Sequence, residues 1–172
     1  MIEPLAMGVI GVGALGRHHV RHLAAMHGVR LVGVCDADTV RAAEVAATFG
    51  CRVFPDCSEL LDEVDAVSVA VPTPAHCEVG LACLERGVAV LMEKPIAVTL
   101  AEADEMLAAA ARHNVVLAVG HIERFNRAMR AARPVLDRPL FVEGIRLAPF
   151  QPRGTDVAVV LDLMIHDLDL AI

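Results

Sequence analysis

Three closely spaced glycines are the feature that most constrains the fold of this chain. The sequence G-V-G-A-L-G, Gly11 to Gly16, follows a short apolar run at 6–10 and opens a helical pattern at 14–26. In a βαβ unit this order gives a tight turn at Gly11, close approach of a pyrophosphate at Gly13, and close packing of helix on strand at Gly16. The sequence therefore predicts a dinucleotide site at the amino end of the first helix.

Apolar runs and helical patterns alternate over the first 120 residues. Such alternation is typical of a parallel sheet with helical crossovers. Gly50 and Gly87 stand where helices end, and Thr99 with Glu102 forms a capping box. We predict an α/β fold, a Rossmann doubly wound parallel sheet in a domain over 1–120, with strands at 6–10, 30–35, 51–54, 66–71, 88–92 and 115–119 and helices at 14–26, 39–49, 58–61, 75–86 and 100–113.

The pattern changes after Gly120. A helix at 124–136, a strand at 140–147 and a second helix at 157–172 are predicted there. The last helical pattern reaches Ile172 without a capping residue or a polar tail, so we expect the chain to be truncated at its C-terminus. Residues 121–172 would then be the beginning of an incomplete α+β domain.

Composition narrows the class of protein. A net charge of −7 and a pI near 5.5 argue against a nucleic-acid partner. Apolar residues make up 56% of the chain, yet no run reaches the roughly 18 residues that span a membrane, and no signal peptide is seen, which predicts a cytoplasmic protein. An odd number of cysteines with no metal or redox spacing predicts small core residues at Cys35, Cys51, Cys57, Cys77 and Cys83.

An acidic residue closes the second predicted strand, twenty residues after Gly16. At that position Asp36 can accept hydrogen bonds from both hydroxyl groups of the adenosine ribose, and its charge would repel a 2′-phosphate. The sequence therefore predicts NAD as the cofactor rather than NADP. Arg41 stands close enough in sequence to turn toward such a phosphate and soften this preference.

Lys94 is the only lysine in a chain with fourteen arginines. A lysine amine can change its protonation state in a protein, whereas an arginine guanidinium cannot. Lys94 directly follows the fifth predicted strand, so we expect it at the carboxyl edge of the sheet, where ligands bind in such folds. Pro95 restricts Lys94 to an extended conformation, and the bond between them could be cis.

Further residues are predicted at the same edge, because they follow the fourth and sixth strands: Pro72, Thr73, His76, His121, Glu123 and Arg124. A helix cap or a packing residue is the alternative for His76. Five other histidines lie on predicted helices or at their ends and are expected at the surface: His18, His19, His22, His27 and His113.

Asp162, His166 and Asp169 share one polar face of the last predicted helix, at positions i, i+4 and i+7. A solvated helix face and a metal site are the alternatives to a catalytic face. A metal site would need a third-ligand geometry and a supporting shell that the pattern does not supply, so no metal is predicted.

Taken together, five motifs resemble the glucose-fructose oxidoreductase, inositol dehydrogenase and MocA (Gfo/Idh/MocA) family. They are G-V-G-A-L-G, Asp36, P-T-P-A-H at 72–76, E-K-P at 93–95 and D-L-M-I-H at 162–166. The resemblance implies an N-terminal Rossmann domain that binds NAD, followed by an open, mostly antiparallel sheet domain that carries the substrate and often forms oligomers. This chain would hold the whole of the first domain and only the opening strand and helix of the second.

The resemblance also implies the roles of individual residues. His166 would act as the general base on a substrate hydroxyl, Lys94 would hydrogen-bond that oxygen and share the proton, and Asp162 would orient its partners. Lys94, Arg124, Asp162 and His166 would bind the substrate. We expect the cofactor to contact Gly11, Gly13, Ala14, Leu15, Gly16, Asp36, Pro72, Thr73, His76, Glu93, Lys94 and His121.

The segment 121–153 carries seven arginines against three acidic residues, which suits a substrate with phosphate oxygens. A solvated basic helix is the alternative. The motifs G-H-I-E-R-F-N and D-L-M-I-H-D-L-D look most like the family's branch of UDP-N-acetylglucosamine 3-dehydrogenases, which supply 3-keto sugars for lipid A synthesis. The resemblance thus implies NAD-dependent oxidation at C3 of that nucleotide sugar. The alternatives are an inositol or free-sugar dehydrogenase of the same family and a non-catalytic NAD-binding regulator.

Overall fold

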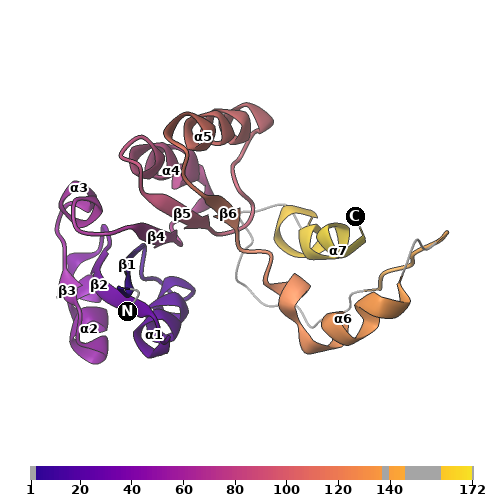
Figure 1. The fold of residues 1–172 in the computed structure, drawn as a ribbon, viewed down its shortest axis with the longest axis horizontal. Helices are drawn as coiled ribbons and strands as arrows, with labels where there is room; N and C mark the ends of the chain where they lie inside the picture. The colour runs from indigo at the N-terminus through magenta and orange to yellow at the C-terminus, as the bar shows by residue number, and fades with distance from the viewer. Residues whose placement is uncertain (1–2, 137–139, 146–159, 172) are drawn as a thin grey trace. The chain divides into compact units, whose positions relative to one another are not determined.

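The structure is a computed structural model, and it describes residues 3–136, 140–145 and 160–171. The chain divides into two compact units, Met1–Val119 and Gly120–Ile172 (Figure 1). This division falls next to the domain boundary that the sequence predicts after Gly120. That the second unit is the beginning of a substrate domain stays a prediction.

The first unit is built on a six-stranded parallel sheet in the order β3-β2-β1-β4-β5-β6. The order reverses between β1 and β4, and this reversal creates the crevice at which such sheets bind their ligands. The predicted doubly wound sheet is confirmed. Its strands are β1 (Leu5–Ile10), β2 (Val29–Cys35), β3 (Arg52–Val53), β4 (Ala66–Val69), β5 (Ala89–Met92) and β6 (Leu117–Val119).

Helices cover both faces of this sheet, which separates two clusters of buried side chains. On one face Val20 of α1 and Val45 of α2 pack with Val9 of β1. On the other face α3 packs on β1 and β2, α4 on β4 and β5, and α5 on α4 and β6, with Leu84 and Met106 among the buried side chains. These helices are α1 (Gly16–Ala25), α2 (Thr39–Phe49), α3 (Cys57–Leu61), α4 (His76–Leu84) and α5 (Leu100–His113), with a 3-10 turn, η1 (Thr73–Ala75), before α4.

Local signals set the ends of these helices. Thr99 and Glu102 form the predicted capping box at α5, and α2 ends at Gly50 in the left-handed conformation. The edge strand β3 is shorter than predicted, since only two residues pair with β2. Within the described residues, no helix is long and apolar enough to cross a lipid bilayer.

The second unit differs from its prediction in two places. The helix predicted over 124–136 is broken, because Asn126 is extended and uses its side chain to cap α6 through the amide of Ala128. The strand predicted over 140–147 is wrong across 140–145, because these residues form no strand in the structure. Residues 146 and 147 lie outside the described residues. The elements here are η2 (Ile122–Phe125), α6 (Arg127–Ala132) and η3 (Arg133–Val135).

The last predicted helix is confirmed over 160–171, while 157–159 and 172 lie outside the described residues. Its first turn is π-helical, η4 (Val160–Met164), and its remainder is α-helical, α7 (Ile165–Ala171).

Candidate functional site

The glycine loop between β1 and α1 is built as the sequence predicts. Gly11 has a φ of +83°, and a Cβ atom there would lie 2.7 Å from the carbonyl oxygen of Ala70. A Cβ at Gly16 would lie 1.8 Å from the carbonyl oxygen of Gly11. A Cβ at Gly13 would meet no atom within 4 Å, so the backbone there borders open space. The loop therefore has the shape of a pyrophosphate cradle, with the exposed residues Ala14 and Leu15 leading into the amino end of α1.

Asp36 stands at the end of β2 and is tied to the glycine loop. Its Oδ2 atom accepts a 2.6 Å hydrogen bond from the amide of Val12, and its Oδ1 atom accepts one of 2.8 Å from the amide of Asp38. Arg41 donates to both oxygens, at 2.7 Å from Nη2 to Oδ1 and 3.3 Å from Nε to Oδ2. Burial raises the pKa of this carboxyl, but the hydrogen bonds from Arg41 and the two amides outweigh it and lower the pKa. Asp36 is thus held as a carboxylate, the form that accepts from ribose hydroxyls.

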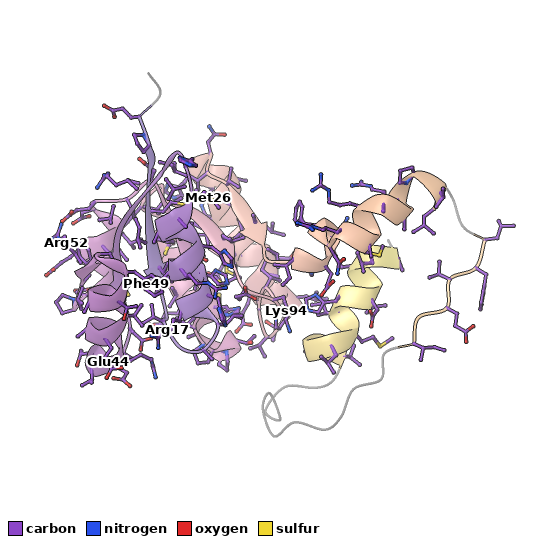
Figure 2. All side chains as sticks on the ribbon, turned by 90° about the horizontal axis from the view of Figure 1, so that it is seen from below. Arg17, Met26, Glu44, Phe49, Arg52 and Lys94 are labelled. Atoms are coloured by element: carbon purple, nitrogen blue, oxygen red, sulfur yellow. The ribbon has the colours of Figure 1, made fainter. Side chains whose placement is uncertain are left out.

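A groove of about 410 Å³ runs between the glycine loop and α2. Its lining includes Gly13, Arg17, Val40, Arg41 and Glu44, and Figure 2 labels Arg17 on α1 and Glu44 on α2. This groove adjoins the Gly13 cradle and the Arg41 partner of Asp36, the region where such folds bind the adenosine half of a dinucleotide. A second hollow of about 570 Å³ lies at the opposite edge, beside the beginnings of the strands, where such folds do not bind their ligands.

Lys94 is the second residue after β5, which ends at Met92, and so lies at the carboxyl edge of the sheet; Figure 2 labels it. The Lys94–Pro95 peptide bond is cis, as the sequence allowed. The neighbouring Glu93 is 7% exposed, and its Oε2 atom accepts a 3.3 Å hydrogen bond from the amide of Lys94. Lys94 is therefore placed at the same edge as the glycine loop, on a backbone that a buried carboxylate holds.

His76 joins this loop to the one that follows β4. The ring is 1% exposed, with Nδ1 at 2.9 Å from the carbonyl oxygen of Pro95 and Nε2 at 3.0 Å from that of Val71. This is the packing role that the sequence left open as an alternative. A contact of His76 with the cofactor stays a prediction, as it does for the nearby Pro72 and Thr73.

The structure corrects the prediction for His19. The sequence predicts this side chain at the surface, but its Nδ1 atom lies 2.6 Å from Oγ of Ser68 and its Nε2 atom lies 2.9 Å from Oε1 of Glu93. The helical period contains a signal for this position, because His19 is three residues after Gly16 and four before Leu23, and both of these are buried on α1.

In the second unit, Asp169 of α7 connects to η2. Its Oδ1 atom accepts a 2.9 Å hydrogen bond from Nε of Arg124, whose Nη2 donates at 2.8 Å to the Asp169 carbonyl oxygen. The Nδ1 atom of His121 lies 3.7 Å from Oδ2 of Asp169. Arg124, expected to bind substrate, is thus placed by an acidic residue in this unit. Across the described parts of the chain, no group of three or more potential metal ligands comes together.

His166 lies half-buried in α7, and Asp162 belongs to η4, where the structure does not describe its side chain. The predicted meeting of Lys94 with Asp162 and His166 joins residues of two units. It stays a prediction.

Known proteins resemble this chain over nearly its whole length. UDP-N-acetylglucosamine 3-dehydrogenase of Acidithiobacillus ferrooxidans is 47% identical over 96% of this chain and 52% of its own length. Inositol 2-dehydrogenase 2 of Saccharopolyspora erythraea is 39% identical over 96% of this chain and 52% of its own length. The chain thus spans about half the length of these curated relatives.

Solved structures agree with this comparison. The Acidithiobacillus ferrooxidans UDP-N-acetylglucosamine 3-dehydrogenase matches with a TM-score of 0.92 at 47% identity, over 99% of this chain and 56% of that one. GenD2 from gentamicin A biosynthesis, solved in complex with NAD, matches with a TM-score of 0.75 at 34% identity, over 80% of this chain and 40% of that one. The profile of the Gfo/Idh/MocA oxidoreductase family, which describes an NAD-binding Rossmann fold, matches residues 5–121. This chain, with its glycine cradle and its Asp36 carboxylate, belongs to that family and carries its NAD-binding domain.

Proposed function

We propose that the protein oxidises a sugar hydroxyl with NAD, and that its substrate is UDP-N-acetylglucosamine, oxidised at C3. The observation that carries this proposal is the position of Lys94, at the sheet edge that also holds the glycine cradle and on a backbone hydrogen-bonded to buried Glu93. A protein that only binds NAD has no use for a fixed amine at that edge. The 47% identity to a UDP-N-acetylglucosamine 3-dehydrogenase supports the choice of substrate.

The residues of this chain divide the work between binding and proton transfer. Gly13 and the amino end of α1 hold the pyrophosphate, and Asp36 accepts from the ribose hydroxyls. NAD held in this way would supply the acceptor for a hydride from the sugar carbon. Lys94 donates a hydrogen bond to the reacting oxygen, His166 removes the hydroxyl proton, and Asp162 orients these two groups.

Exposed arginines support a substrate with phosphate groups. Arg127, Arg130 and Arg133 follow one another at three-residue intervals along α6 and η3, and all three are exposed. At that spacing they share one face of the helix, where guanidinium groups can bind a diphosphate in pairs. An inositol or a free hexose has no such charge to match.

The test is turnover by the protein expressed from its intact gene. Mixed with NAD and UDP-N-acetylglucosamine, it should produce NADH, followed by absorbance. Lys94→Arg should lower kcat by about 100-fold or more, because a guanidinium cannot share the proton at that position. The matched control is Arg112→Lys on the exposed side of α5, which should leave kcat unchanged.

Other outcomes separate the alternatives. NADH formation with inositol or free hexoses, and none with the nucleotide sugar, would reject the substrate. Binding of NAD without turnover of any of these compounds would favour a regulator. A cytoplasmic location and assembly into homo-oligomers are further parts of this proposal, which fractionation and light scattering would check.

A further inference from the structure

A chain of three polar side chains lies beneath the Lys94 loop. Ser68 of β4, His19 of α1 and Glu93 after β5 are joined by contacts of 2.6 Å and 2.9 Å. This row of hydrogen-bonded side chains leads to the backbone of Lys94, whose amide donates to the second oxygen of Glu93 at 3.3 Å. It therefore connects the helix of the glycine cradle to the only lysine.

The strand pattern explains why these side chains meet. Side chains alternate between the two faces of a strand. Ala66, two residues before Ser68, and Ala89, four before Glu93, both pack in the cluster under α1 and α2. Ser68 and Glu93 therefore point toward α1, and His19 lies on the inward side of that helix between Gly16 and Leu23.

Ser68 and Glu93 are buried, so loss of any of their hydrogen bonds would leave a polar group without a partner away from water and lower the stability of the fold. Ser68 is 1% exposed and Glu93 is 7% exposed. Burial raises the pKa of Glu93, but the hydrogen bond and the charge of His19, together with the amide and the charge of Lys94, outweigh it and lower the pKa. Buried ion pairs in proteins can often be replaced by apolar side chains of similar volume without loss of stability. Hydrogen bonds depend on direction, so the contacts of Glu93 fix the orientation of its carboxylate relative to the backbone of Lys94.

We propose that His19 is a positioning residue: together with Ser68 it fixes the Glu93 carboxylate, and through Glu93 it sets the place of Lys94 relative to the helix that binds the cofactor's phosphates. This inference rests on the proposed role of Lys94 at the reacting oxygen. His19 itself touches neither substrate nor cofactor in this scheme.

A serine, a histidine and an acid in contact also form the nucleophile triad of hydrolases. That function does not fit here, because Ser68 is 1% exposed in an interior strand and no substrate can reach its hydroxyl. The geometry therefore points to support of a neighbouring residue.

The single lysine supplies a readout that does not depend on turnover. When this chain is labelled with ¹³C in lysine only, its spectrum holds one set of lysine signals, from Lys94. His19→Gln and Glu93→Gln should each shift and broaden the Lys94 side-chain signals, because the loop loses its fixed partner. The matched controls are His18→Gln and His22→Gln, which replace exposed histidines of the same helix and should leave the signals in place.

Kinetics of the protein from its intact gene supply the second readout. His19→Gln should lower kcat by about 10- to 100-fold, the effect expected of a misplaced catalytic group, with little change in the KM for substrate or NAD. The double variant His19→Gln with Glu93→Gln should be no slower than the slower single variant, since both remove the same link.

Each outcome decides between the proposals. Unmoved lysine signals and an unchanged kcat, accompanied only by a lower melting temperature, would overturn the positioning role and leave His19 as packing. Shifted signals in a protein that oxidises no sugar would refute the proposed function, while His19 would still be shown to place Lys94.

Discussion

At the scale of single residues, Asp36 carries two tasks. It is the acidic residue proposed to bind the ribose of the cofactor, and it pairs with Arg41, which lines the adjoining groove. Asp36→Asn removes the charge that repels a 2′-phosphate and weakens the hold on Arg41. We expect the Kd for NADH to rise by about 10-fold, and the Kd for NADPH to fall, in fluorescence titrations.

The double variant Asp36→Asn with Arg41→Ala is the control for this expectation. It should lose the gain in NADPH binding, because the guanidinium that would pair with the phosphate is absent. An equal gain in both variants would show that Arg41 plays no part.

Glu93 makes a prediction about pH. Its pKa in the folded protein is lowered from the ordinary value of 4.5, so the carboxylate contributes stability that is present above pH 4.5 and is lost as the pH falls through the folded pKa. Glu93→Gln should therefore melt at a lower temperature than the wild type at neutral pH, and the difference should shrink below pH 4.5. The test extends to about pH 3, which is below the ordinary pKa range of carboxyl groups. A difference in melting temperature that stays constant over this whole range would contradict the prediction.

At the scale of elements, the glycine loop separates folding from binding. Gly16→Ala places a methyl group 1.8 Å from the Gly11 carbonyl oxygen. This clash prevents α1 from packing closely on the loop after β1, so the melting temperature should fall. Gly13→Ala meets no atom within 4 Å and should change the free energy of unfolding by less than about 0.5 kcal/mol. Its methyl would instead occupy the pyrophosphate space, so NAD titrations should show a Kd raised by about 10-fold or more.

The first unit could be predicted from sequence because its signals are local and agree with one another. The capping box at Thr99 and the apolar runs of the strands place elements without knowledge of the partners. His19 is predicted outside because it is polar. The helical period places it beside buried Gly16 and Leu23, but its polar partners Ser68 and Glu93 are distant in sequence. Across 140–145 the predicted strand is wrong for a related reason, since a strand forms only where another strand pairs with it.

At the scale of the whole molecule, the two units differ in how far the apolar side chains of their described residues are buried from solvent. The two buried clusters consist of residues of the first unit only. In the second unit Phe125 is 76% exposed, Phe141 80% and Ile145 77%. The first unit therefore has its own hydrophobic core, while the described residues of the second unit leave most of their large apolar side chains exposed.

This contrast predicts that residues 1–120 fold alone. Expressed without 121–172, the segment should melt cooperatively and bind NAD with a Kd within about 3-fold of the whole chain, because the cradle and Asp36 both lie within it. Circular dichroism and NAD titration would check both parts. Failure to melt cooperatively would show that the second unit completes the core.

The hydrogen bond from the Val12 amide to Asp36 has a consequence for evolution of coenzyme preference. The carboxylate proposed to select the coenzyme also accepts from the Val12 amide in the first turn, so a substitution that removes its oxygen acceptors affects both properties. A lineage that exchanges this acid to accept the phosphorylated coenzyme would need a substitute acceptor for the Val12 amide. Ancestral variants on that route should therefore carry a compensating polar residue near the turn.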